Sequence, residues 1–361
     1  MKKTILYEIN TSDDLFLKTL RKKVNNYFSE NQLSKYGNRQ IIFKTIFFLT
    51  VFFLSYFLAI SNQFPPFITL LLAITCGLSS VLIVFNIAHD ASHNALFSNK
   101  KLNQILTYTF NLVGSNAYMW NILHNKIHHK YPNIADTDPD IYQGAPFIRI
   151  SPRAPHRFYH GYQHIYAPFL YLTYSLYLIY LKDFQDFKVL WKSDYTPPDL
   201  KHSAKEYIIL FFSKACYLIY SLIIPLLVLD FLWWQTLIGY LIVHLFMSLL
   251  LAAVLIPVHM VDGATFLSSN EKLQIPKSWM ANVFENTIDY SRKSKLANYF
   301  FGGLNAHLGH HLFPDICHVH LVNITDIIKS TAESNGLYYR NVTMWQAIKS
   351  HFKLLKKMGS T

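Results

Sequence analysis

The stretch FITLLLAITCGLSSVLIVFNIAHDASH, residues 67–93, decides the fold, because a long apolar run leads directly into two histidines. About 20 consecutive apolar residues are enough for a helix to cross the hydrocarbon core of a bilayer. In HDASH, at the end of the run, His89 and His93 are four residues apart and share one helix face. The sequence therefore predicts a membrane-spanning helix that carries two imidazoles at one membrane edge.

Three further stretches have a similar length and apolar character. With the first, they form two pairs, each joined by a short turn, and the predicted spans are residues 43–61, 67–88, 207–229 and 232–257. Only 15% of the 361 residues are charged, against about 25% in soluble domains. These features predict an all-α integral membrane protein with four transmembrane helices.

The distribution of basic residues predicts how the chain is oriented. The net charge is +12, and all but two of the 33 Lys and Arg residues lie in residues 1–42, 89–205 and 258–361. Positively charged segments stay on the cytoplasmic side of a membrane. We therefore expect both termini and the long central loop to be cytoplasmic, and we interpret the charge as a sign of topology rather than of nucleic-acid binding.

Clustered histidines follow the predicted spans, all on the expected cytoplasmic side. HNKIHH occupies residues 124–129, HLGHH occupies residues 307–311, and His259 follows the fourth span. Because 3.6 residues make one helical turn, His124 and His128 are expected to point to one site and His129 to a neighbouring one. The nine candidate metal ligands are His89, His93, His124, His128, His129, His259, His307, His310 and His311.

The number of these histidines predicts two metal ions. Imidazole binds Zn, Cu, Fe and Ni, but a single zinc site needs only three or four ligands. Nine nitrogens suit two ions with four or five ligands each. An isolated histidine is more often structural, so we interpret His244, within the fourth span, as structural and His351 as a surface residue.

Carboxylates near the histidines are candidates for orienting them, because a ligating imidazole usually donates its other N–H to a carboxylate or a carbonyl. Each carboxylate has a simpler alternative role as a helix cap or a solvated side chain. The four candidates are Asp90, Asp138, Asp262 and Asp315.

HDASH, HNKIHH and HLGHH resemble the three histidine boxes of membrane fatty acid desaturases. GGLN at 302–305, HHLFP at 310–314 and CHVH at 317–320 resemble the last box of the bacterial linoleoyl-CoA desaturase-like and front-end desaturase group. His259 in VHMVDGATF resembles the additional ligand of that group. The resemblance covers roughly residues 14–325.

The resemblance implies a non-haem di-iron centre, O₂ as co-substrate, and a cap of cytoplasmic helices over the four spans. It also implies that the acyl chain enters a hydrophobic tunnel. We accordingly divide the chain into a cytoplasmic amphipathic region, a membrane desaturase domain and a basic cytoplasmic helical tail, at residues 1–42, 43–325 and 326–361.

The sequence departs from the front-end pattern in two respects. His307 stands where front-end enzymes commonly have Gln, and the fused cytochrome b5 domain of many of them is not found. Electrons are therefore expected from a separate acidic protein, a ferredoxin or a cytochrome b5. The basic residues of the predicted cytoplasmic face either dock this partner or only contact lipid headgroups; they are Arg149, Arg153, Arg157, Arg292, Lys293 and Lys295.

The predicted activity is the formation of a cis double bond in a fatty acyl chain carried on a lipid, coenzyme A or acyl carrier protein. A hydroxylase, an acetylenase or a ketolase on the same scaffold is the alternative. A histidine-rich metal transporter is a more distant one, because a transporter places its ligands within the spans near the bilayer midplane. Here the clusters lie beyond the span ends.

Overall fold

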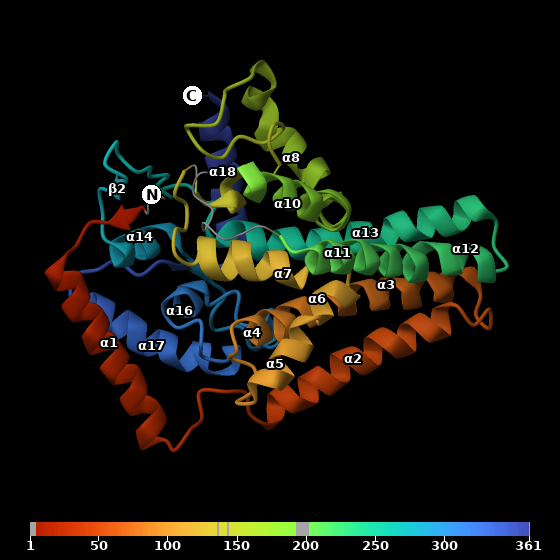
Figure 1. Ribbon diagram of the computed structural model, residues 1–361, viewed down its shortest axis with the longest axis horizontal. Helices are drawn as coiled ribbons and strands as arrows, with labels where there is room; N and C mark the ends of the chain where they lie inside the picture. The colour runs from red at the N-terminus through yellow and green to blue at the C-terminus, as the bar shows by residue number, and fades with distance from the viewer. Residues whose placement is uncertain (1–4, 136, 143, 193–201, 361) are drawn as a thin grey trace. The chain divides into compact units, whose positions relative to one another are not determined.

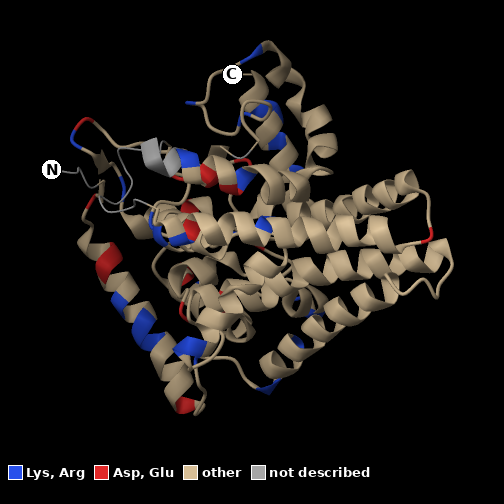
Figure 2. Ribbon diagram, turned by 45° about the vertical axis from the view of Figure 1, so that its right-hand side comes forward, with Lys and Arg blue, Asp and Glu red and all other residues tan. Residues whose placement is uncertain are grey.

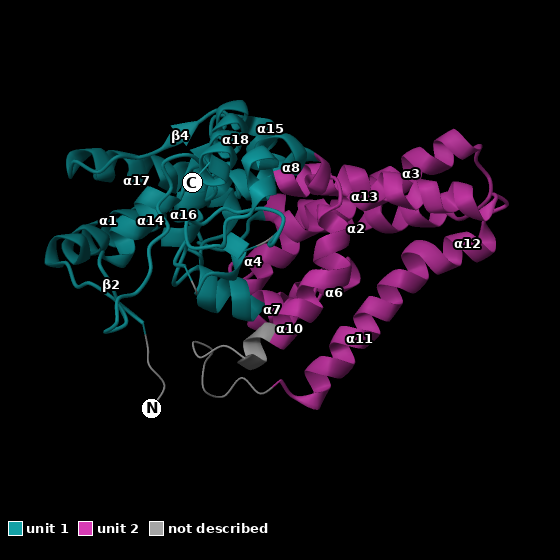
Figure 3. Ribbon diagram, turned by 90° about the horizontal axis from the view of Figure 1, so that it is seen from above, with its two compact units in different colours: residues 1–38, 121–168, 253–361 teal, residues 39–120, 169–252 magenta. Residues whose placement is uncertain are grey.

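The computed structural model describes residues 5–135, 137–142, 144–192 and 202–360 (Figure 1). Within them regular structure is almost wholly helical, and the four strands have two residues each. The chain divides into two compact units (Figure 3). Unit 1 comprises Met1–Asn38, Asn121–Pro168 and Ala253–Thr361, and unit 2 comprises Arg39–Trp120 and Phe169–Ala252.

Unit 2 contains the membrane-spanning helices, except that the last residues of the fourth, from Ala253 onwards, belong to unit 1. Among the described residues, four helices are long and apolar enough to cross a membrane, so the prediction of four transmembrane helices is confirmed. They are Arg39–Ala59, Pro66–Ser92, Ala204–Val228 and Trp233–Val258. Each is long enough to cross a bilayer, and Figure 2 shows few charged residues along them. The chain is therefore an integral membrane protein.

The spans are built from α-helices interrupted by wider turns. The first span is α2 (Arg39–Ala59), and the second is α3 (Pro66–Ile83), the π-helical η1 (Val84–Ala88) and α4 (His89–Ser92). Pro66 opens α3 at a position where a missing N–H is not needed. The third comprises α11 (Ala204–Leu218), η6 (Ile219–Ile223) and α12 (Ile224–Val228), and the fourth α13 (Trp233–Leu255) and η7 (Ile256–Val258).

Shorter helices complete unit 2, and a buried ion pair ties them to the third span. They are α5 (Lys100–Thr107), α6 (Thr109–Leu112), α7 (Ala117–Trp120), α9 (Tyr174–Tyr177), η5 (Leu178–Lys182) and α10 (Asp183–Lys192). Lys214 in α11 lies 2.5 Å from Asp183 and donates to the Gly114 carbonyl at 2.5 Å. A basic residue within a span thus has both a charge partner and a hydrogen-bond partner, as its burial requires.

Unit 1 packs its helices around an apolar core. Its N-terminal helix α1 (Thr11–Glu30) begins at Asn10, whose side chain accepts two backbone N–H bonds, and buries Phe16, Leu20 and Val24. These residues pack in one cluster with residues of α14 (Trp279–Asn286), α16 (His307–Leu312) and α17 (Leu321–Ser334). Figure 2 shows basic residues along the outer side of α1.

The remaining elements of unit 1 connect segments that are distant in sequence. Parallel pairs join β1 (Leu6–Tyr7) to β2 (Gln274–Ile275), and β3 (Asp289–Tyr290) to β4 (Asn341–Val342). The middle segment contains the π-helical η2 (Asn121–His128), η3 (Pro139–Tyr142), η4 (Phe158–Tyr162) and α8 (Gln163–Tyr171). The last residues of α8 belong to unit 2. The C-terminal segment also contains α15 (Lys295–Phe300), η8 (His318–His320) and α18 (Met344–Ser360).

Candidate metal centre

The last histidine cluster lies on the short helix α16. His307, His310 and His311 are all buried there. The residue preceding the helix, Ala306, has no side-chain acceptor, and the buried carboxylate of Asp289 instead accepts the backbone N–H of Leu308 at 2.9 Å. Asp289 also accepts the Tyr339 hydroxyl at 2.6 Å. A side chain from β3 therefore caps the helix that carries three candidate ligands.

His124 and His128 of the second cluster lie on η2, and His129 follows it directly. The His129 N–H donates to the His124 carbonyl at 3.1 Å, five residues back, as in a π-helix. The Nε2 atoms of His124 and His129 are 3.2 Å apart, whereas His128 faces His259. Ligand atoms of His124 and His128 also lie within 4.8 Å of each other and of Asp140, so the expectation that both point to one site stays a prediction.

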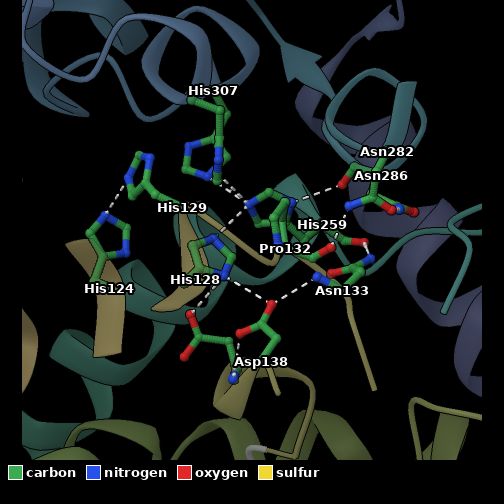
Figure 4. Close-up of polar contacts among 12 residues, drawn as sticks. His124, His128, His129, Pro132, Asn133, Asp138, His259, Asn282, Asn286 and His307 are labelled. Carbon is green, nitrogen blue, oxygen red and sulfur yellow. Dashed lines mark hydrogen bonds and ion pairs between the residues drawn. The ribbon is translucent and has the colours of Figure 1, made fainter. Parts of the chain in front are cut away.

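Four histidines of unit 1 converge on one point (Figure 4). Ligand atoms of His128, His259, His307 and His311 all lie within 4.8 Å of one another. The Nε2 atom of His259 is 3.1 Å from that of His128, 2.9 Å from that of His307 and 3.0 Å from that of His311. All four rings are buried.

Hydrogen bonds at Nδ1, the ring nitrogen that does not face the other histidines, fix the tautomers of His128 and His259. His128 Nδ1–H donates to Asp138 Oδ2 at 3.0 Å, and His259 Nδ1–H donates to the Asn286 carbonyl at 2.8 Å. A neutral imidazole has one N–H and one lone pair, so both Nε2 atoms present lone pairs to each other. Facing lone pairs repel unless a proton on His128 or a metal ion lies between them, and the converging rings therefore fit a metal ion that takes the place of this proton.

The charges around His128 also favour a cation. Burial opposes protonation, but Asp138 and Asp140 raise the pKa of His128 to about 9. Burial and the nearby charge of His128 lower the pKa of His259 to about 3. Burial, together with the neighbouring histidines, lowers the pKa of His311 well below its usual value. The group thus combines carboxylates that attract positive charge with neutral rings that can bind a metal.

Three asparagines, each at most 1% exposed, link the segment after the second cluster to His259. Asn133 Nδ2 donates to the His259 carbonyl at 3.2 Å. On α14, Asn286 Nδ2 donates to Asn282 Oδ1 at 2.9 Å, and Asn282 Nδ2 donates to the Pro132 carbonyl at 2.8 Å. Figure 4 shows these residues beside His259. Because each buried amide donates to a carbonyl or to another amide, this network holds the backbone on both sides in fixed positions.

The other predicted ligands are distributed over both units. In unit 1 the ring of His310 lies 4.6 Å from that of His129 and 5.8 Å from that of His124. In unit 2, at the end of the second span, the rings of His89 and His93 are 5.2 Å apart. His89 Nδ1 is 3.3 Å from Asp90 Oδ1.

The aspartates predicted to orient the histidines differ in their partners. Asp138 is completely buried, contacts His128 and accepts the backbone N–H of Asn133 at 2.8 Å. Asp262 instead pairs with Lys353 at 2.6 Å, and Asp315 with Lys35 at 2.5 Å.

Three residues interpreted as surface groups are buried. His351 is 3% exposed, and its Nδ1–H donates to the Met260 carbonyl at 2.7 Å. Arg149 is buried and donates to the carbonyls of Pro152 and Ala154, both at 2.8 Å. Arg292 is buried and pairs with Asp326 at 2.7 Å. Arg149 and Arg292 therefore do not belong to an exposed basic face.

Sequence reasoning missed Asp289 and the asparagine network. Asp289 lies 18 residues before the helix that it caps, and nothing local marks it as a cap. Asn282 and Asn286 are four residues apart, and this spacing alone indicates only that they share a helix face. Their partners come from other segments, so only the fold identifies their role.

Comparisons with known proteins agree with this arrangement. The profile of the fatty acid desaturase family matches residues 65–343. The chain is 30% identical, over its whole length and 75% of the relative, to an acyl-lipid (8-3)-desaturase of Physcomitrium patens. It is 29% identical to an sn-1 linoleoyl-lipid 6-desaturase of Synechocystis, over 95% of both chains. It is also 29% identical to acyl-lipid (8-3)-desaturase B of Dictyostelium discoideum, over 96% of this chain and 76% of the relative.

Proposed function

Because this chain belongs to the fatty acid desaturase family, we propose that it introduces a cis double bond into a fatty acyl chain by O₂-dependent oxidation at a non-haem di-iron centre. Membership makes it a fatty acid desaturase, an oxidoreductase, and the family generally uses two irons and O₂. The observation that carries the proposal is the convergence of His128, His259, His307 and His311.

We propose that the nine predicted histidines bind two iron ions. They are His89, His93, His124, His128, His129, His259, His307, His310 and His311. When bound, the irons would supply the oxidising power needed to remove hydrogen from two adjacent unactivated methylene groups. The protein supplies ligand geometry and a dry, buried setting.

The residues around the ligands have distinct tasks. Asp138 orients His128 and holds its proton on Nδ1, and the Asn286 carbonyl does the same for His259. Such partners fix the direction of the metal-binding lone pair. Asp289 holds the first turn of α16 in place. Burial of the rings excludes water, so the oxidising power is directed to the acyl chain.

A cavity of about 300 Å³ in unit 2 offers space for an acyl chain. Its lining is mainly apolar and includes Phe52, Ala73, Gly239 and Met247. Ligand sites for apolar molecules are usually concave and mostly apolar. We propose that the chain of the substrate enters it. The names of the relatives refer to acyl lipids, which supports a membrane lipid as the carrier.

We propose that unit 1, both termini and all histidine clusters are cytoplasmic. The support is the location of basic residues outside the spans. Electrons would come from a separate acidic ferredoxin or cytochrome b5. With Arg149 and Arg292 buried, the exposed docking candidates are Arg153, Arg157, Lys293 and Lys295. Complementary charge of this kind mainly speeds encounter.

Mass spectrometry of lipids from a desaturase-deficient host that expresses the chain tests the proposed reaction. We expect an acyl product that is lighter by 2 mass units because two hydrogens are lost. The matched control is the His128→Ala variant at equal expression. A main product heavier by 16 mass units would identify a hydroxylase instead, and unchanged lipids with a compatible donor present would contradict the proposal.

A further inference from the structure

The C-terminal helix α18 lies just beyond the part of the chain that matches the family. The match ends at residue 343, and α18 comprises Met344–Ser360. One face of the helix is buried and includes His351, Leu354 and Leu355. The helix belongs to unit 1, with the four converging histidines. Its packing therefore has a direct bearing on the metal centre.

The first half of α18 contacts the segment that immediately follows the predicted ligand His259. The N–H of His351 Nδ1 donates to the Met260 carbonyl at 2.7 Å. The backbone N–H of Asp262 is 3.1 Å from both the carbonyl and the hydroxyl oxygen of Ser350. Lys353 pairs with the Asp262 carboxylate at 2.6 Å. The two chain segments are thus joined at successive positions.

Apolar side chains of α18 also pack against residues before and after His259 in the sequence. Ala347 of α18 is completely buried in a cluster that contains Val258 and Val261. Val258 precedes the ligand and Val261 follows it by two residues. The backbone that carries His259 is therefore in contact with α18 through both hydrogen bonds and apolar side chains.

The second half of α18 is fixed by side chains of the 149–163 segment. The last carbonyls of a helix have no partner within the helix and need another donor. The guanidinium of Arg149 donates to the Met358 carbonyl, which is one of these. Gln163 Nε2 donates to the Leu355 carbonyl, about one turn earlier, at 2.7 Å. A cation at this end also interacts favourably with the helix dipole. Arg149 and Gln163 are both buried, so these contacts are not surface pairs.

Close backbone packing completes this second attachment. A Cβ atom at Gly359 would lie 2.0 Å from the His160 carbonyl oxygen, so no larger residue fits without a shift. The Gly359 carbonyl also lies 2.9 Å from His156 Nε2. With both ends held, α18 has little freedom to move along or about its axis.

We propose that α18 is a positioning element of the metal centre, and that His351 acts through the Met260 backbone to hold His259 in its ligand geometry. The proposal rests on the ligand role of His259 proposed above. Met260 is the next residue in the chain, so a shift of its carbonyl turns the His259 backbone and with it the direction of Nε2. His351 is a positioning residue and touches no reacting atom.

The test is the rate at which the purified holoenzyme releases iron to an excess of a chelator. The His351→Leu variant leaves the Met260 carbonyl without its donor, and we expect release about 10- to 100-fold faster, as for other groups that orient ligands. The His351→Asn variant places an amide N–H close to the position of Nδ1 and should restore slow release. The His351→Gln variant places its amide one bond further out and should not.

A destabilised control separates positioning from general packing. Leu354 is 1% exposed on the same helix, and the Leu354→Ala variant should lower the melting temperature but leave iron release within about twofold of wild type. The proposal would be overturned if Leu354→Ala and His351→Leu released iron equally fast. It would also be overturned if the His351→Asn variant released iron as fast as the His351→Gln variant. If His351→Leu does not fold, the Asn and Gln variants decide. A wild-type chain without iron would instead contradict the proposed function itself.

Discussion

Buried histidines occur in both units, and the two sets differ in the hydrogen-bond partners of their two ring nitrogens. In unit 2, His244 is 1% exposed within α13, with Nδ1 2.8 Å from the Ser175 hydroxyl and Nε2 3.4 Å from the Tyr217 hydroxyl. In unit 1, His128 and His259 each give one nitrogen to an oxygen acceptor and turn the other towards imidazole nitrogens.

The difference shows that burial alone does not distinguish a ligand from a structural histidine. A hydroxyl can donate or accept, so His244 is satisfied in either tautomer. His128 and His259 have no such freedom, because the Asp138 carboxylate and the Asn286 carbonyl hold a proton on Nδ1 of each ring. Their facing Nε2 atoms need a proton or a metal ion between them, and the convergence of two further Nε2 atoms, of His307 and His311, on His259 identifies the candidate metal centre.

Removal of one converging ring should have the largest effect. The His311→Ala variant loses a ligand whose surroundings cannot supply another, so we expect it to form no unsaturated product and to lose iron. Product analysis and metal analysis of the same preparation check both. Full activity with a normal iron content would show that His311 is structural, like His244.

Removal of the partner of a ring should have a smaller effect. The Asp138→Asn variant keeps the shape of the side chain but loses the charge that orients His128, and iron affinity or activity should fall about 10- to 100-fold. The control is Asp315→Asn, because Asp315 is exposed and pairs with Lys35. Equal losses in both variants would contradict a specific role for Asp138.

Filling the cavity of unit 2 should change the substrate preference and leave iron unaffected. A Cβ atom at Gly239 would meet only Leu70, at 3.9 Å, so a Gly239→Leu side chain can extend into the cavity. Excluding two buried methylenes costs about 1.6 kcal/mol, so conversion of the longest acyl chains should fall about tenfold.

Leu241→Phe adds bulk on α13 at an exposed position, and it serves as the control for the cavity experiment. It should leave the product distribution unchanged. An unchanged distribution in Gly239→Leu as well would show that the acyl chain does not enter this cavity.

The smallest effect is expected at His244. The His244→Leu variant leaves the Ser175 and Tyr217 hydroxyls without a ring partner, and hydrogen bonds between helices in membranes contribute about 0.6 to 1.7 kcal/mol. We expect a modest fall in melting temperature and an unchanged amount of iron per folded chain. Loss of iron would remove the distinction between the two sets of histidines.

The sequence predicts the spans and the ligand candidates because both depend on local patterns. Twenty apolar residues identify a span such as Pro66–Ser92 without reference to the rest of the fold. Histidine spacing identifies candidates such as His307 and His311, which the structure places together.

The arrangement around the ligands depends on contacts between distant segments, which local patterns do not encode. The π-helical turn brings the Nε2 atoms of His124 and His129 to 3.2 Å, a contact that an α-helical period does not predict. Asp289 and Asn286 act on ligands that belong to other elements. His351 resembled a surface residue because its partner, Met260, lies 91 positions away.

Metal analysis of the purified protein tests most directly whether the histidine clusters bind two iron ions. We expect two iron ions per chain. A chelator should remove both the iron and the activity, and addition of ferrous iron should restore both. One zinc ion per chain and no iron, in a preparation that is folded and active, would contradict the di-iron assignment.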